Sequence, residues 1–236
     1  SNVRFGVNAG NSIQSGGNNN TVIGDESGTA VTTGDNNTLV GSLSGDALTT
    51  GGCNVAVGKS ALSADTLGEK NVAIGCGALE TQNFTTATDS FNTAVGYQAG
   101  VSITTGKNNT LVGANAGDAL TTGELNVAIG DTALGADDVG NRTVAIGFAA
   151  LQSQNFSTST ISYNTAVGYG AGSSVSTGIE NTILGYEAGD AITTGIRNQC
   201  FGRSAGTALT DADYNVAIGT FALGADTMGS RSTAVG

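Results

Sequence analysis

Carboxylates are the only side chains in this sequence whose spacing invites a catalytic interpretation. Asp46, Asp118 and Asp190 stand at equivalent, equally spaced positions, and Asp137 adjoins Asp138. Paired carboxylates support acid–base chemistry when they lie about 5 to 9.5 Å apart. In the repeat described below, successive members of the Asp series are separated by four coils, so at about 4.8 Å per coil they lie roughly 19 Å apart. The chain also has no His, the usual general base. We therefore expect no enzyme and no catalytic residues.

The cysteines and acidic residues form no metal-binding pattern. Cys53, Cys76 and Cys200 occupy different positions of the repeat, without a CxxC spacing and without the His of many zinc sites. No coil carries the alternating Asp residues of calcium-binding β-rolls. We expect free thiols, no metal site and no cofactor.

The elements that must position every side chain are copies of one pentapeptide, Asn-Thr-Ala-Val-Gly at residues 92–96. Fourteen copies occur, most of them at 17-residue intervals, with 21-residue intervals ending at Gly96 and Gly168. A fixed period in this range is typical of a solenoid. The strand positions favour β-branched residues, Gly marks a corner, and the chain contains no Pro, which a central strand excludes. We expect an all-β fold, a parallel β-solenoid or β-roll of about 13 mostly 17-residue coils at one strand spacing each, with a short second strand around residues 120–122.

Apolar residues fill both faces of the repeated strand. The residue before each Gly is large and apolar in every copy, and the residue three before is Val or Thr in all copies but one. Side chains alternate along a strand, so these two columns share one face, which we assign to the interior. Ile129 is one example. The residue two before Gly is most often Ala, and we assign this column, with Ala128 and Ala145, to contact with neighbouring chains.

Asn stands four residues before Gly in twelve of the fourteen copies, and Thr143 and Ser232 replace it in the others. Stacked coils place like residues about 4.8 Å apart, so these amides can bond to the coils above and below. The predicted structural ladder consists of Asn37, Asn54, Asn71, Asn92, Asn109, Asn126, Asn164, Asn181, Asn198 and Asn215.

A longer period groups the coils into four-coil blocks near residues 24–96, 96–168 and 168–236, the third with an added coil. We expect a single repeat array over residues 1–236. Neither end supplies the polar cap that a solenoid needs, so we expect this array to be a segment of a longer fibre.

Charge and hydropathy exclude two classes of partner. The net charge is −11, with only eight Lys and Arg residues, whereas nucleic-acid binding demands a basic surface. No apolar run approaches the length of a membrane-spanning helix, roughly 18 residues or more, so we expect no membrane insertion.

The two 21-residue coils insert four residues each, within segments 79–91 and 151–163. Polar loops with a single aromatic are candidates for sugar contact on a fibre, so we predict receptor contacts at Phe84, Asp89, Phe156 and Tyr163. The alternative is that Phe84 and Phe156 pin each insertion to the body. Further aromatic residues follow the corner Gly, and we expect them to shield strand edges or subunit seams: Tyr97, Phe148, Tyr169, Tyr186 and Phe221.

The run Asn-Thr-Ala-Val-Gly-Tyr-Gln-Ala-Gly at 92–100, with Asn-Val-Ala-Ile-Gly at 71, 126 and 215, resembles the repeats of trimeric autotransporter adhesin heads. It resembles still more the Gly-rich repeats of phage tail fibres and bacterial surface proteins that end in an intramolecular chaperone domain. The resemblance covers essentially the whole chain, although the adhesin coil is a few residues shorter. It implies a left-handed β-roll with three parallel chains around one axis.

The function that this resemblance implies is a structural fibre segment of a trimeric attachment protein, such as a phage tail fibre or a bacterial surface adhesin. Such a segment is a rigid spacer, extracellular on a virion or cell surface. Its partners are two further copies of itself, in a homotrimer, and a host-cell surface or glycan receptor.

An alternative function is an ice-binding solenoid. Thr-Thr-Gly sequences recur at 32–34, 49–51, 104–106, 121–123 and 193–195, with Ser176-Thr177 equivalent. A flat array of Thr is one way in which ice-binding surfaces are built. Here the array covers only part of the coils.

Overall fold

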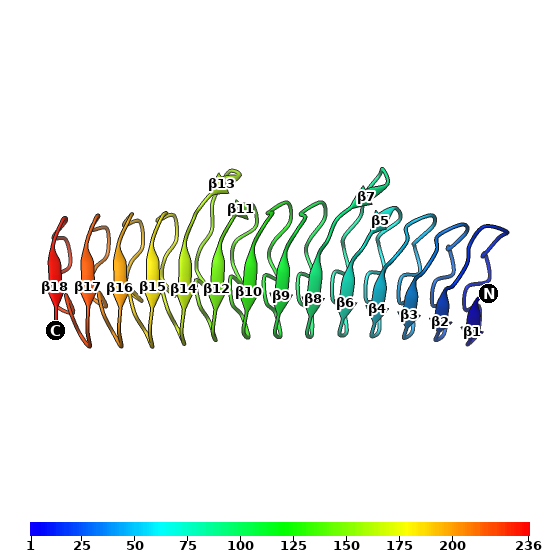
Figure 1. The fold of residues 1–236 in the computed structure, drawn as a ribbon, viewed down its shortest axis with the longest axis horizontal. Helices are drawn as coiled ribbons and strands as arrows, with labels where there is room; N and C mark the ends of the chain where they lie inside the picture. The colour runs from blue at the N-terminus through cyan, green and yellow to red at the C-terminus, as the bar shows by residue number, and fades with distance from the viewer. The chain divides into compact units, whose positions relative to one another are not determined.

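The computed structural model describes residues 1–236. It divides into two compact units, Ser1–Thr122 and Gly123–Gly236, and each is described by itself. Each unit contains one short parallel strand per turn (Figure 1). The first unit has β1 (Val3–Phe5), β2 (Thr21–Ile23), β3 (Thr38–Val40), β4 (Val55–Val57), β6 (Val72–Ile74), β8 (Thr93–Val95) and β9 (Thr110–Val112). The second has β10 (Val127–Ile129), β12 (Val144–Ile146), β14 (Thr165–Val167), β15 (Thr182–Leu184), β16 (Gln199–Phe201), β17 (Val216–Ile218) and β18 (Thr233–Val235).

The fold is an all-β parallel β-solenoid without helices, which confirms the predicted class. Within each unit, neighbouring strands pair so that like residues stack on like. Val127 pairs with Val144 and Ala128 with Ala145, one turn later in the chain. This register keeps each column of the repeat as a column in space.

Second strands occur only beside the two insertions. In the first unit β5 (Gly68–Glu69) pairs with β7 (Thr88–Asp89), and in the second β11 (Gly140–Asn141) pairs with β13 (Thr160–Ile161). The loops that carry β7 and β13 extend beyond the neighbouring loops of their units (Figure 1). These two short sheets are what the inserted residues of each longer turn add to the fold.

The predicted second strand at residues 120–122 is wrong, since these residues form none. The equivalent position in an earlier turn shows the reason. The N–H groups of Thr32 and Gly34 both donate to the carbonyl oxygen of Thr49, at 2.8 and 3.3 Å. In a parallel ladder, N–H groups two residues apart donate to different carbonyl groups of the neighbouring strand, so two donors that converge on one acceptor do not form one.

The predicted interior face of the strand is also wrong. Ala128 is 0% exposed, whereas Ile129 is 36% exposed. The same reversal holds along the solenoid: the column two before Gly, with its Ala residues, points inward, and the larger residue before Gly points outward. The interior is filled by this column, which also includes the buried Leu39 and Ile183, by the buried Asn residues and by Leu side chains of the loops such as Leu48. Both faces of the strand are apolar, so the sequence pattern alone does not distinguish them.

The corner Gly column has a steric cause. Gly58 has a φ of +134°, a region that other residues rarely adopt. A Cβ at this position would lie 2.5 Å from the carbonyl oxygen of Gly75 in the next turn. The close stacking of successive corners therefore requires Gly.

Because Ala128 points inward and Ile129 outward, the same substitution should destabilise the fold much more at residue 128 than at residue 129. Ala128→Asp places a carboxylate in an enclosed interior and should lower the free energy of unfolding by at least about 3 kcal/mol. Ile129→Asp should cost about 1 kcal/mol in the single chain, because that side chain already reaches solvent. Thermal unfolding of the two variants measures the difference, and a more damaging Ile129→Asp would contradict the assignment.

Candidate functional site

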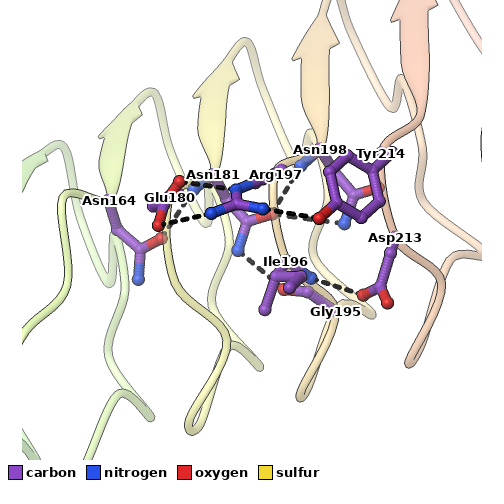
Figure 2. Close-up of polar contacts among 9 residues, drawn as sticks. All are labelled: Asn164, Glu180, Asn181, Gly195, Ile196, Arg197, Asn198, Asp213 and Tyr214. Carbon is purple, nitrogen blue, oxygen red and sulfur yellow. Dashed lines mark hydrogen bonds and ion pairs between the residues drawn. The ribbon is translucent and has the colours of Figure 1, made fainter.

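The Asn column forms a buried ladder within each unit. The Asn164 side chain holds the next turn at two points, as Oδ1 accepts the N–H of Asn181 at 2.9 Å and Nδ2 donates to the carbonyl oxygen of Gly178 at 2.7 Å. Asn181 does the same for the following turn, accepting from Asn198 at 2.9 Å and donating to Gly195 at 2.8 Å (Figure 2). All ten Asn residues of the predicted ladder are buried. Most turns are therefore fixed to their successors by one carboxamide, and Thr143 takes its place in one turn of the second unit.

A buried carboxylate ties down the insertion of the first unit. Asp65 Oδ1 accepts the N–H groups of Gly68, at 2.9 Å, and Phe84, at 3.3 Å. Its Oδ2 accepts Nε2 of Gln82 at 2.6 Å, and Gln82 Oε1 accepts Nδ2 of Asn92 at 2.8 Å. A directed chain of donors thus runs from the Asn ladder to the Asp65 carboxyl group, which accepts at both oxygens.

The second unit repeats this arrangement at the equivalent positions of the next four-coil block. Asp137 accepts the N–H of Gly140 at 2.9 Å and Nε2 of Gln154 at 2.6 Å. Gln154 Oε1 in turn accepts Nδ2 of Asn164 at 2.8 Å. The recurrence assigns a structural role to Asp137, and not the catalytic one that its neighbour Asp138 could suggest.

The four predicted receptor contacts fall into two groups. Phe84 and Phe156 are only 6% and 5% exposed, so a receptor can reach almost none of either ring. Their burial supports the alternative interpretation, in which the rings pin the insertions to the body. Asp89 and Tyr163 are exposed and remain available for contact.

An exposed column of large side chains lies next to the ladder in the second unit, five residues before each corner Gly from Gly147 onward. We call it the Arg–Tyr column, and its members are Arg142, Tyr163, Glu180, Arg197, Tyr214 and Arg231. Arg197 donates to Glu180 at 2.7 Å and to the hydroxyl oxygen of Tyr214 (Figure 2). The guanidinium groups of Arg197 and Arg231 lie 5.3 and 5.6 Å from the centre of the Tyr214 ring. The Arg197 guanidinium holds the pKa of Glu180 below its usual value.

The backbone of this column is unusual for the residues it carries. Arg142, Glu180 and Tyr214 have φ between +58° and +59°, the left-handed region that favours Gly and Asn. The first unit places Asn19, Asn36 and Asn108 at this position, as the backbone prefers. No member of the Arg–Tyr column is Gly or Asn. Lys70 and Phe91 of the first unit adopt this conformation too, so both units accept backbone strain where they carry large exposed side chains.

A second exposed row follows the corner Gly. The rings of Phe148 and Tyr169 stack with centroids 5.0 Å apart, and those of Tyr169 and Tyr186 with centroids 5.3 Å apart. Arg203 continues the row, between the rings of Tyr186 and Phe221. Stacking in register turns single aromatic residues of the sequence into one continuous strip.

Sequence reasoning identified Tyr163 and the row after the corner but missed Arg142, Arg197, Tyr214 and Arg231. The signal was available in the repeat, because all of them stand five residues before a corner Gly. Because this position carries cations, anions and aromatic rings in different turns, its residue types form no visible repeat, and the contacts between them appear only when the turns are stacked.

The Thr pairs use half of their hydroxyls internally. Thr32 Oγ1 donates to the carbonyl oxygen of Thr49 at 3.1 Å, and Thr49 Oγ1 to that of Thr66 at 3.0 Å. The second Thr of the pairs, such as Thr33 and Thr50, is exposed. The equivalent of Thr50 one turn later is Leu67, so the exposed hydroxyls are interrupted. Ice binding stays a prediction.

Buried carboxylates set the expected pH dependence of stability. Burial raises the pKa of Asp65 and Asp137, and also of Asp46 and Asp118, above the usual carboxyl value. The folded chain then binds protons at a higher pH than the unfolded chain does. This part of the stability is full below the unfolded pKa, near 4, and is lost as pH rises through the raised values.

We therefore expect the free energy of unfolding to rise when the pH falls from 7 towards 4. Denaturant titrations at several pH values measure this slope. Asp65→Asn is the control, since it removes one titrating group and should flatten the profile even if its overall stability is lower. A stability that falls steadily from pH 7 to 5 in the parent chain would contradict the assignment.

No group of three or more His, Cys, Asp or Glu side chains lies together in a way that could hold a metal ion. The structure contains no helix of the length and apolarity needed to cross a membrane. Comparison with family models, with curated proteins and with solved structures found no match.

Proposed function

We propose that this chain is a structural fibre segment of a trimeric attachment protein, extracellular on a virion or cell surface. The observation that carries the proposal is the outward face of the strands. Ile74, Leu184 and Ile218 stand just before a corner Gly and are 38%, 47% and 42% exposed. Parallel sheets bury both faces in almost all known proteins, and here the interior covers only one.

Flanking residues extend this apolar face. The column three before Gly carries Val or Thr beside it, half-buried in most turns. The row after the corner adds the stacked rings of Phe148, Tyr169 and Tyr186, each about half exposed. Such a repeating stripe is rare on a soluble monomer and is typical of a surface that packs against another chain. The partner that matches a repeating stripe best is a second copy with the same period.

The Ala column does not support this proposal, because the chain itself buries it. The apolar outward columns take its place as the contact between copies. The number of copies, three, comes from the resemblance to adhesin and tail-fibre repeats.

A spacer role fits the way in which the turns are joined. The carboxamide ladder and the strand pairing connect every turn to its neighbours within each unit, and neither depends on a ligand. Contact with a receptor falls to residues that stand out from the repeat, among them Asp89 and Tyr163 at the insertions.

Light scattering at micromolar protein concentration tests the assembly. The parent chain should have the mass of three copies. Leu184→Glu combined with Ile218→Glu should shift the mass towards one copy. Each subunit would bring two carboxylates into the contact between copies, where they would be buried beside the carboxylates of the other two subunits. Thr177→Glu combined with Thr194→Glu adds the same charge at exposed positions away from the strand face and should leave the mass unchanged. A parent chain with the mass of a single copy would contradict the proposal.

A further inference from the structure

The two insertions are close copies, and they differ at one interaction on the surface. In the first unit Lys70 Nζ donates to Asp89 Oδ2 at 2.6 Å and lies 5.4 Å from the centre of the Phe91 ring. The ammonium group is thus neutralised by a carboxylate of the insertion itself. Lys70 therefore has little positive charge left for an anionic ligand.

At the equivalent place in the second unit, the carboxylate is missing. Arg142 replaces Lys70, Tyr163 replaces Phe91, and Ile161, 44% exposed, replaces Asp89. Arg142 donates to the hydroxyl oxygen of Tyr163 at 3.0 Å and lies 5.9 Å from the centre of its ring, but it forms no ion pair. The guanidinium group therefore keeps donors for an anion.

A shallow depression opens beside this guanidinium. Its volume is about 230 Å³, and it is lined by Glu124, Leu125, Asn141, Arg142, Ser159 and Ile161. Asn141 Nδ2 donates to Ser159 Oγ at 3.0 Å, which leaves the Ser159 hydroxyl proton available to another acceptor. Leu125 and Ile161 are exposed and give the depression an apolar side.

We propose that this depression binds a carboxylate-bearing sugar residue of a glycan. This inference rests on the proposed function, since it assigns the receptor class of an attachment protein. The planar guanidinium of Arg142 suits a carboxylate, with two parallel hydrogen bonds. Ser159 donates to ring or hydroxyl oxygens of the sugar. Leu125 and Ile161 pack against the C–H face of the sugar ring.

The lining distinguishes this ligand from simpler anions. Sulfate or phosphate offers no apolar face for Leu125 and Ile161. A neutral sugar leaves Arg142 without its charged partner. A carboxylate sugar satisfies the cation, the hydroxyl groups and the apolar side together.

Isothermal titration calorimetry of the full chain tests the assignment with 3′-sialyllactose and trigalacturonate as carboxylate sugars. Maltotriose serves as the neutral sugar, sodium sulfate as the simple anion, and a tetraglutamate peptide as the acidic peptide. We expect one of the carboxylate sugars to bind at least about tenfold more tightly than the other three probes, the effect of one charge-assisted hydrogen-bond pair.

Two substitutions borrowed from the repeat locate the site. Ile161→Asp restores the residue of the first unit and should weaken sugar binding about tenfold or more by pairing Arg142 internally. Arg142→Asn should do the same, and Asn is the residue that this backbone position carries at Asn19, Asn36 and Asn108. Thr194→Asp is the control, since it adds an exposed carboxylate elsewhere in the unit and should leave binding unchanged.

Binding of sulfate, maltotriose or the peptide as tight as that of the carboxylate sugars would overturn the assignment. Binding of a carboxylate sugar that survives Ile161→Asp and Arg142→Asn would also overturn it, and so would the absence of any binding by the carboxylate sugars. Light scattering of the same samples separates this inference from the proposed function. A three-copy mass without sugar binding overturns the sugar site alone, and a single-copy mass with sugar binding overturns the assembly alone.

Discussion

A buried carboxamide that recurs in most turns is the interaction on which the rest of the structure depends. Asn181 illustrates it, with Oδ1 accepting the main-chain N–H of Asn198 and Nδ2 donating to the carbonyl oxygen of Gly195. Each of these groups is enclosed, and a buried polar group left without a partner costs about 1 to 3 kcal/mol. The register of one turn on the next, and with it the stacking of the corner Gly residues, is thereby specified many times over. The insertions attach to the same ladder through Gln82 and Asn92 in the first unit, so they extend the repeat without breaking it.

The ladder also decides where the large side chains go. Because the amides and the column two before Gly occupy the interior, the large apolar residues just before each Gly point outward, where they form a surface suited to contact between copies. The residue just before the Asn position, five before each corner Gly from Gly24 onward, has a left-handed backbone conformation and a side chain that reaches solvent. This second position varies freely between turns, and the second unit uses it for the Arg–Tyr column. The repeat thus separates a constant interior geometry from two surfaces that can carry function.

The period of the sequence was sufficient to predict the solenoid, the parallel strands, the corner Gly and the position of the Asn ladder, because each follows from stacking like on like. It was not sufficient to tell inside from outside. Ala128 and Ile129 are both apolar, and the inward column itself mixes Ala with larger residues such as Leu39, so residue type alone does not mark the inner face. The surface site was hidden for another reason. Arg142 has meaning only beside Ile161, which belongs to the next turn and replaces the Asp89 that neutralises Lys70 in the earlier insertion. A comparison of the two insertions, position by position, would have exposed it, since one salt bridge is present in the first and absent from the second.

Native-state hydrogen exchange in the Asn181→Ala variant tests the carboxamide ladder most directly. The amide of Asn198 loses its acceptor, so its exchange should accelerate at least about tenfold relative to the parent chain, with a smaller effect on amides several turns away. Thr194→Ala, at an exposed position beside the Gly195 carbonyl, should leave the Asn198 amide protected. An unchanged exchange rate for Asn198 in Asn181→Ala would mean that main-chain pairing alone holds the turns together, and would contradict the account.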